Sequence, residues 1–232
     1  GEQEAFDGHN DLSAELLNRS IALDPYLIPG VMDFYLYEMK RPDLALAAAR
    51  GKLNAMQTLE ERLANAKMAP DVLATVRKEL RQIYLKEAAQ PKPDPWLVSL
   101  AADAEHRAGN DQHAIELYRD ILSQQPDHAP TLQALEGLKG GDKDPLGAAA
   151  VLEPVYEAAS DWMKLVSVHE VQVQHTKDVF QKVELLHRIA RLHEDAMDNH
   201  GAAFDTYARA VAIDNGNSET LGNLERIATL VN

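Results

Sequence analysis

The chain has 232 residues, of which 45% are hydrophobic and 26% are charged, the composition of an ordinary folded protein. Its formal net charge is −14, and no basic stripe interrupts the acidic sequence. Because nucleic acids and anionic membrane surfaces are bound mainly through Lys and Arg, we expect neither as a partner. The sequence has no cysteine, which excludes disulfides, thiolate catalysis and Cys-ligated metal sites.

No apolar run approaches the roughly 18–20 residues that span a bilayer, so we expect no membrane insertion. No signal peptide is visible. Gly1 stands where an initiator Met would be expected, which indicates a trimmed chain and leaves a removed signal open. The compartment, cytoplasm or periplasm, is therefore undetermined.

The first predicted element covers residues 8–25 and resembles the second half of a helix pair. Its expected buried stripe is Leu12, Leu16, Leu17 and Ile21, and Asp24-Pro25 closes it. Because the sequence begins in the middle of a pair, we expect a longer array to precede it.

A short helix rich in Tyr and Met is predicted at 28–40. Pro42 then opens a helix that is expected to run as far as Leu63, since a proline in the first helical turn loses no hydrogen bond. Residues 65–70 break the pattern, and 71–88 are predicted to form a further amphipathic helix. We interpret 42–88 as one elongated or degenerate helix pair.

The clearest pattern is at 95–128, where two amphipathic runs flank a turn at Gly109-Asn110. The faces predicted to be buried consist of Leu97, Leu100, Ala101 and Ala104 in the first run, and of Ala114, Leu117, Tyr118, Ile121 and Leu122 in the second. Pro126 ends the second helix, because a proline disfavours helical geometry in the residue before it.

This segment of 34 residues resembles a tetratricopeptide repeat (TPR), whose period is also 34 residues. The matching positions are Ala102, Ala114, Tyr118, Ile121 and Pro126. The resemblance implies that the small Ala102 and Ala114 let the two antiparallel helices approach closely, and that Tyr118 and Ile121 fill the gap to the next helix. It also implies an array of helix hairpins with one wall exposed for another chain.

Further helices are predicted at 129–138, 146–158, 179–198 and 218–230, with others begun by Asp161 and Gly201. From residue 145 the sequence resembles a degenerate, bacterial-type TPR array, through Leu152 to Tyr156, Asp161-Trp162, 184–186 and 203–217. The charged, glycine-containing segment 139–144 is the expected break in regular packing. An alternative interpretation is that the chain is an engineered fusion of two repeat fragments joined at this segment.

The predicted fold is therefore all-α, a right-handed α-solenoid of about six antiparallel helix pairs, about twelve helices in all. Residues 1–140 form TPR-like repeats, with 95–128 as the best of them. Residues 141–232 are expected to continue the same solenoid with degenerate repeats.

No catalytic or metal-binding constellation emerges from the sequence. His193 and His200 are seven residues apart, roughly 10 Å along one helix face, which is too far for a single ion. Adjacent acidic residues point about 100° apart on a helix and do not share a proton. We expect no enzymatic activity and no cofactor.

In TPR proteins the first helix of each repeat lines a groove that binds a peptide. Carried onto this sequence, the groove residues are Trp96, Ser99, Asp103, His106 and Arg107, and then Glu184, His187 and Arg191, with Glu194 and Asp195 beyond them. Alternative roles are a staple at the Pro-rich turn for Trp96, and intrahelical ion pairs of Arg107 with Asp103 and of Arg191 with Asp195.

TPRs that clamp the acidic tails of chaperones use Lys and Asn at fixed groove positions, where this chain has Ser99 and Asp103. An aspartate would repel a carboxylate, so the resemblance implies a neutral or basic partner segment. We therefore expect a non-enzymatic scaffold that binds a peptide or helix of another protein. Two alternatives remain: a self-assembly domain that forms a homo-oligomer, and an ancillary region of a larger enzyme.

Overall fold

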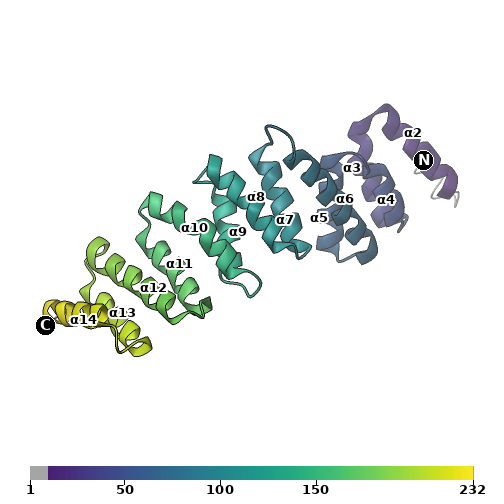
Figure 1. Ribbon diagram of the computed structural model, residues 1–232. Coiled ribbons are helices and arrows are strands. Elements are labelled where there is room, and N and C mark those ends of the chain that lie inside the picture. The colour runs from purple at the N-terminus through teal and green to yellow at the C-terminus, as the bar shows by residue number, and fades with distance from the viewer. Residues whose placement is uncertain (1–9, 232) are drawn as a thin grey trace. The chain divides into compact units, whose positions relative to one another are not determined.

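In a computed structural model that describes residues 10–231, the chain is all-α, as the sequence predicted. The described residues form thirteen α-helices and no strand, and within each of the two units described below consecutive helices pack on one another (Figure 1). The chain divides into two compact units, Gly1–Leu97 and Val98–Asn232. The predicted division at Gly140 falls inside the second unit.

The first unit contains five α-helices among its described residues, joined by short turns. They are α2 (Asn10–Leu23), α3 (Ile28–Asp33), α4 (Pro42–Ala49), α5 (Leu53–Ala66) and α6 (Pro70–Ala88), with the one-turn 3₁₀ helix η1 (Pro25–Leu27) between α2 and α3. Helix α4 contacts α3 on one side and α5 on the other, and α5 packs along α6 (Figure 1). Of the predicted stripe on α2, Leu17 and Ile21 are buried, whereas Leu12 is exposed.

The single helix predicted from Pro42 to Leu63 is wrong, because the structure has two helices there. Helix α4 ends at Ala49, Gly51 takes a left-handed φ of +79°, and α5 begins at Leu53. A left-handed residue cannot continue an α-helix, and glycine adopts this conformation at little cost. The apolar spacing continues across Gly51, which is why periodicity alone hid the break.

Helix α3 continues into η2 (Phe34–Glu38), one turn of π-helix. The extra residue in this turn buries three consecutive side chains, Phe34, Tyr35 and Leu36, which an α-helix would spread over different faces. The Tyr35 hydroxyl has one proton to share between two acceptors on α2, the Ala14 carbonyl oxygen at 3.2 Å and the Asn18 side-chain oxygen at 3.3 Å, so it ties this turn to α2.

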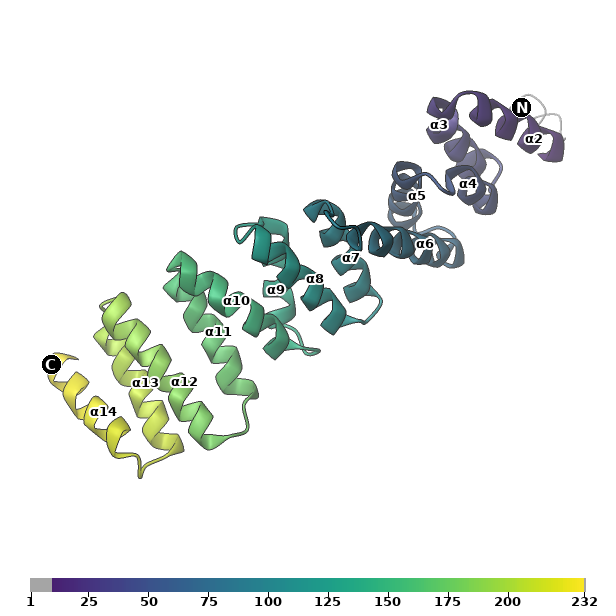
Figure 2. The same ribbon diagram turned by 45° about the horizontal axis from the view of Figure 1, so that its top comes forward.

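The second unit is a row of helices in which each one packs on the next (Figure 2). From Val98 on, its helices are α7 (Pro95–Arg107), α8 (Asp111–Gln124), α9 (Ala129–Lys139), α10 (Pro145–Ala159), α11 (Trp162–His175), α12 (Val179–Arg191), α13 (His200–Ile213) and α14 (Ser218–Val231), with the π-helical turn η3 (Leu192–Ala196) after α12. Helices two apart in this order also meet, as α8 and α10 do.

The hairpin of α7 and α8 has the packing that the sequence predicted. Ala102 and Ala114 have no exposed surface, and Tyr118 and Ile121 are buried beside them. The turn between the helices depends on Gly109, whose φ of +86° is left-handed. Both small side chains are therefore fully enclosed, as a close approach of two helices requires.

Helices α9 and α10 pack directly across the Gly140-Gly141 turn. The buried Tyr156 of α10 donates a hydrogen bond of 2.5 Å to the Glu136 carboxylate of α9, which also pairs with Lys139 at 2.7 Å. Burial, reinforced by the neighbouring carboxylate, raises the pKa of the Tyr156 phenol. The tyrosine is therefore a neutral donor that joins the two helices.

The last four helices share two buried clusters. One joins α11, α12 and α13 through Val173, Leu186, Ile189 and Ala210. The other joins α12, α13 and α14 and consists of Ala190, Ala203, Tyr207 and Ile227. Because α12 contributes to both, its opposite edge is left facing away from the core.

Candidate functional site

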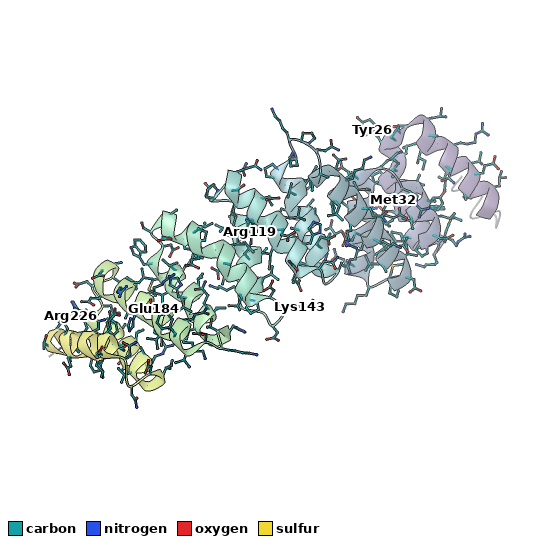
Figure 3. All side chains as sticks on the ribbon, in the orientation of Figure 1. Tyr26, Met32, Arg119, Lys143, Glu184 and Arg226 are labelled. Carbon is teal, nitrogen blue, oxygen red and sulfur yellow. The ribbon has the colours of Figure 1, made fainter. Side chains whose placement is uncertain are left out.

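Helix α12 positions the side chains of the candidate site. Asp178 precedes the helix, and its carboxylate accepts a hydrogen bond of 2.8 Å from the Gln181 backbone, which satisfies one of the free N–H groups of the first turn. The apolar face of α12 is buried in the two clusters, so Glu184 (labelled in Figure 3), Arg188 and Arg191 lie along its polar edge.

Two adjoining hollows lie over this edge. The larger one, which we call the Phe180 hollow, has a volume of about 520 Å³. The exposed side chains of Leu146 and Phe180 and the half-buried Leu185 give it an apolar lining. Its other lining residues are polar or charged: Glu153, Gln172, Thr176, Gln181, Glu184 and Arg188.

The smaller one, the Trp162 hollow, has a volume of about 350 Å³. Its lining comes from α10, α11, α12 and the π-helical turn η3: Glu153, Glu157, Trp162, Leu165, His169, Arg188, Arg191, Leu192, Asp195 and Ala196. Glu153 and Arg188 line both hollows and are 3.7 Å apart across the boundary between them. The two hollows therefore form one depression, the α10–α12 groove.

The cations of this groove are already paired with carboxylates. Arg188 faces Glu153, and Arg191 lies 3.2 Å from Glu219 of α14. Glu153 also accepts a hydrogen bond of 2.7 Å from the Gln172 amide.

Three lining carboxylates, Glu157, Glu184 and Asp195, have no ion-pair partner within 4 Å among the described residues. The two hollows together are lined by four carboxylates and by only two arginines, Arg188 and Arg191, so the groove has a negative surplus. It is therefore electrostatically suited to a cation.

The predicted groove residues fall into an N-terminal set on α7, from Trp96 to Arg107, and a C-terminal set, from Glu184 to Asp195. Within the C-terminal set, Glu184 lines the Phe180 hollow and Arg191 lines the Trp162 hollow, so the structure brings these two residues to the same groove. His187 is buried with 1% of its surface exposed, its Nε2 lies 2.8 Å from the Thr220 hydroxyl, and its ring packs edge-on against Tyr207. His187 thus joins α12, α13 and α14 and has no surface to offer a ligand.

The two acids at the end of the C-terminal set lie on η3. Glu194 binds Arg226 of α14 through two contacts, one of them 2.8 Å, and this pairing holds the pKa of the Glu194 carboxyl below its usual range. Asp195 lines the Trp162 hollow instead. The intrahelical pair of Arg191 with Asp195 does not form, since Arg191 reaches across to Glu219.

The N-terminal set on α7 lines neither hollow. Trp96 is half exposed, with its backbone N–H bonded to the Asp94 carboxylate at 2.9 Å. Ser99 is buried, and the exposed Arg107 forms no ion pair with Asp103.

The other polar side chains of α7 contact α8. Asp103 accepts a hydrogen bond from the Tyr118 hydroxyl, and His106 lies against Asp111. Burial, together with the Asp103 carboxylate, raises the pKa of Tyr118, which keeps the phenol protonated as the donor. These contacts join the two helices of the hairpin, and Trp96, His106 and Arg107 are the exposed members of the set.

Sequence reasoning missed the part of the groove that α10 and α11 supply. Glu153 and Glu157 of α10 and Trp162 of α11 were not among the predicted site residues, although Trp162 stood out as an aromatic residue directly after a helix cap. Phe180, at the start of α12, was missed as well. No group of three or more His, Asp and Glu residues in the described part of the chain is arranged to hold a metal ion. Between residues 10 and 231, helices long and apolar enough for a membrane span are also lacking.

Comparison with known proteins gives no family assignment. No protein-family model matches the chain, and no curated protein matches it. Among solved structures, the crystal structure of BtubC (BKLC) from P. vanneervenii aligns with 92% of this chain and 83% of its own, at 16% sequence identity and a TM-score of 0.31. That TM-score does not define a shared fold, so the description of the site depends on its geometry alone.

Proposed function

We propose that this chain is a TPR-type repeat protein, a non-enzymatic scaffold that binds a neutral or basic segment of another protein in the α10–α12 groove. The helix hairpins and the buried alanines at matched positions of 95–128 support the repeat assignment. A right-handed superhelical course belongs to the same proposal.

The observation that supports the binding function most is the pair of adjoining hollows over α12, with their apolar walls and surplus of carboxylates. In a repeat array each helix is stabilised by its neighbours, so an exposed wall can bind a ligand without disturbing the core. Concave sites with an apolar lining and a few polar groups are the usual binding places in proteins.

Site-specific photo-crosslinking in cells of the source organism tests this proposal. A benzophenone amino acid replaces Gln181, which lines the Phe180 hollow, and in a control chain it replaces Gln174, an exposed glutamine of α11 outside both hollows. We expect a protein adduct from position 181 that position 174 does not give.

The crosslinked protein is then purified and bound to the unmodified chain. Charge reversal by Glu184→Arg should weaken this binding by at least tenfold. Equal adducts from both positions, or a partner indifferent to Glu184→Arg, would show that the groove is not the binding surface.

A further inference from the structure

The two hollows of the α10–α12 groove differ in chemistry. The Phe180 hollow has three apolar side chains, Leu146, Phe180 and Leu185, two of them exposed to solvent. Exposed apolar side chains gathered in a depression favour an apolar side chain of a ligand, because contact removes both surfaces from water. This half of the groove is suited to a branched aliphatic or aromatic side chain.

The Trp162 hollow places an indole ring beside Glu157 and Asp195, neither of which is ion-paired. An aromatic face attracts a cation through its quadrupole, and carboxylates at the rim supply the opposite charge. The same chemistry occurs next to this hollow, where the Lys164 ammonium lies 5.1 Å from the centre of the Tyr156 ring. This half is suited to the head group of a Lys or Arg.

The spacing between the hollows sets the length of segment that can reach both. Glu184 is the middle one of the residues that α12 contributes to the Phe180 hollow, and Leu192 is the middle one of those that α12 and η3 contribute to the Trp162 hollow. These two residues are eight positions apart, which corresponds to about 12 Å at the 1.5 Å rise of a helix. An extended segment advances about 3.3 Å per residue, and residues i and i+4 point to the same side about 13 Å apart.

On the basis of the proposed function, we infer that the groove recognises an extended segment of a partner protein with an apolar side chain in the Phe180 hollow and, four residues away in either chain direction, a Lys or Arg in the Trp162 hollow. The Glu153–Arg188 pair lies between the two hollows and faces the three intervening residues. The charge balance of the groove supports a basic segment, because its own arginines are already neutralised.

A library of random twelve-residue peptides displayed on phage, selected against the full chain, tests this inference. We expect enrichment of sequences with an apolar and a basic residue four positions apart. One enriched peptide is then synthesised with a fluorescent label, and its dissociation constant is measured by fluorescence anisotropy.

Two variants address the two hollows separately. Phe180→Ser removes the most exposed of the three apolar side chains of the Phe180 hollow. Its control, Met163→Ser, removes an equally exposed apolar side chain outside both hollows. The double variant Glu157→Gln with Asp195→Asn removes two groove charges, and Asp205→Asn with Glu225→Gln removes two exposed charges elsewhere. We expect each groove variant to raise the dissociation constant of the peptide by about tenfold and each control variant to leave it unchanged. Far-UV circular dichroism should show that all the variants fold.

The outcomes separate this inference from the proposed function. The inference is overturned if the enriched peptides depend on the groove residues but lack the apolar–basic pair. It is also overturned if the apolar and the basic residue are seven or eight positions apart, as they would be in a bound helix. Either outcome leaves the proposed groove function in place. An absence of enriched peptides, or peptides indifferent to every groove variant, overturns both.

Discussion

Replacement of one buried alanine by leucine tests whether small residues set the approach of the helices. Ala149 and Ala150 are neighbours on α10, but Ala149 has no exposed surface and Ala150 is exposed. Ala149→Leu adds three carbon atoms to a side chain that has no exposed surface. Ala150→Leu adds the same atoms in water, and the helix propensities of the two residues are close.

The expected loss follows from the packing of protein interiors. Extra methylene groups in a close-packed core force side chains and backbone to shift, which typically costs about 1–3 kcal/mol. We expect Ala149→Leu to lower the free energy of unfolding by about 2 kcal/mol and Ala150→Leu to change it by less than about 0.5 kcal/mol.

Urea denaturation followed by circular dichroism at 222 nm measures both variants. With a urea dependence of about 2 kcal/mol per molar, the midpoint should fall by about 1 M for Ala149→Leu and stay in place for Ala150→Leu. Equal shifts, or a gain in stability from Ala149→Leu, would refute the argument that the helices meet at this alanine.

Three further predictions concern contacts inside the units. Tyr156→Phe removes the hydrogen bond to Glu136 and should lower the free energy of unfolding by about 1.5 kcal/mol; an unchanged urea midpoint would contradict a role for this bond. Gly109→Ala should lower the free energy of unfolding by about 1 kcal/mol, because the φ of Gly109 is +86°. Gly137→Ala in α9 should raise the urea midpoint, because a Cβ added there meets nothing within 4 Å. Equal effects of the two substitutions would contradict this reasoning. Burial lowers the pKa of His193 below its ordinary value of about 6.5, so the imidazole binds a proton more readily in the unfolded chain than in the folded one. The folded state therefore has its full stability above about pH 6.5 and loses stability as the pH falls below this value. His193→Phe should flatten the pH dependence of the midpoint between pH 7.5 and 5, and an unaltered slope would assign it to other groups.

The fold was predictable from sequence where a local rule decides the structure. The turn at Gly109 and the burial of Ala114 follow from the spacing of the apolar residues, and the burial of Ala102 follows from the resemblance to a TPR. The break at Gly51 was missed because the apolar spacing of Leu44 to Leu59 continues across it, and an isolated glycine costs a helix only about 1 kcal/mol.

The candidate site was predictable only in part, for a different physical reason. The resemblance to a TPR placed Glu184, His187 and Arg191 along a groove-lining helix, and the structure keeps the first and last of them in the groove. It covers His187 with Thr220 of α14, which lies 33 residues further along the chain. Contacts between helices that are not adjacent in sequence leave no trace in the periodicity of either one, and the contribution of α10 was missed for the same reason.

The order of the helix contacts in the second unit has a consequence for how this unit folds. Its main contacts join helices that are adjacent or next but one along the chain. Low contact order of this kind means that no long loop has to close before the first stable pair exists, so such topologies fold within microseconds to milliseconds. Any hairpin of the row can therefore act as the nucleus, and the remaining helices add to it from either side.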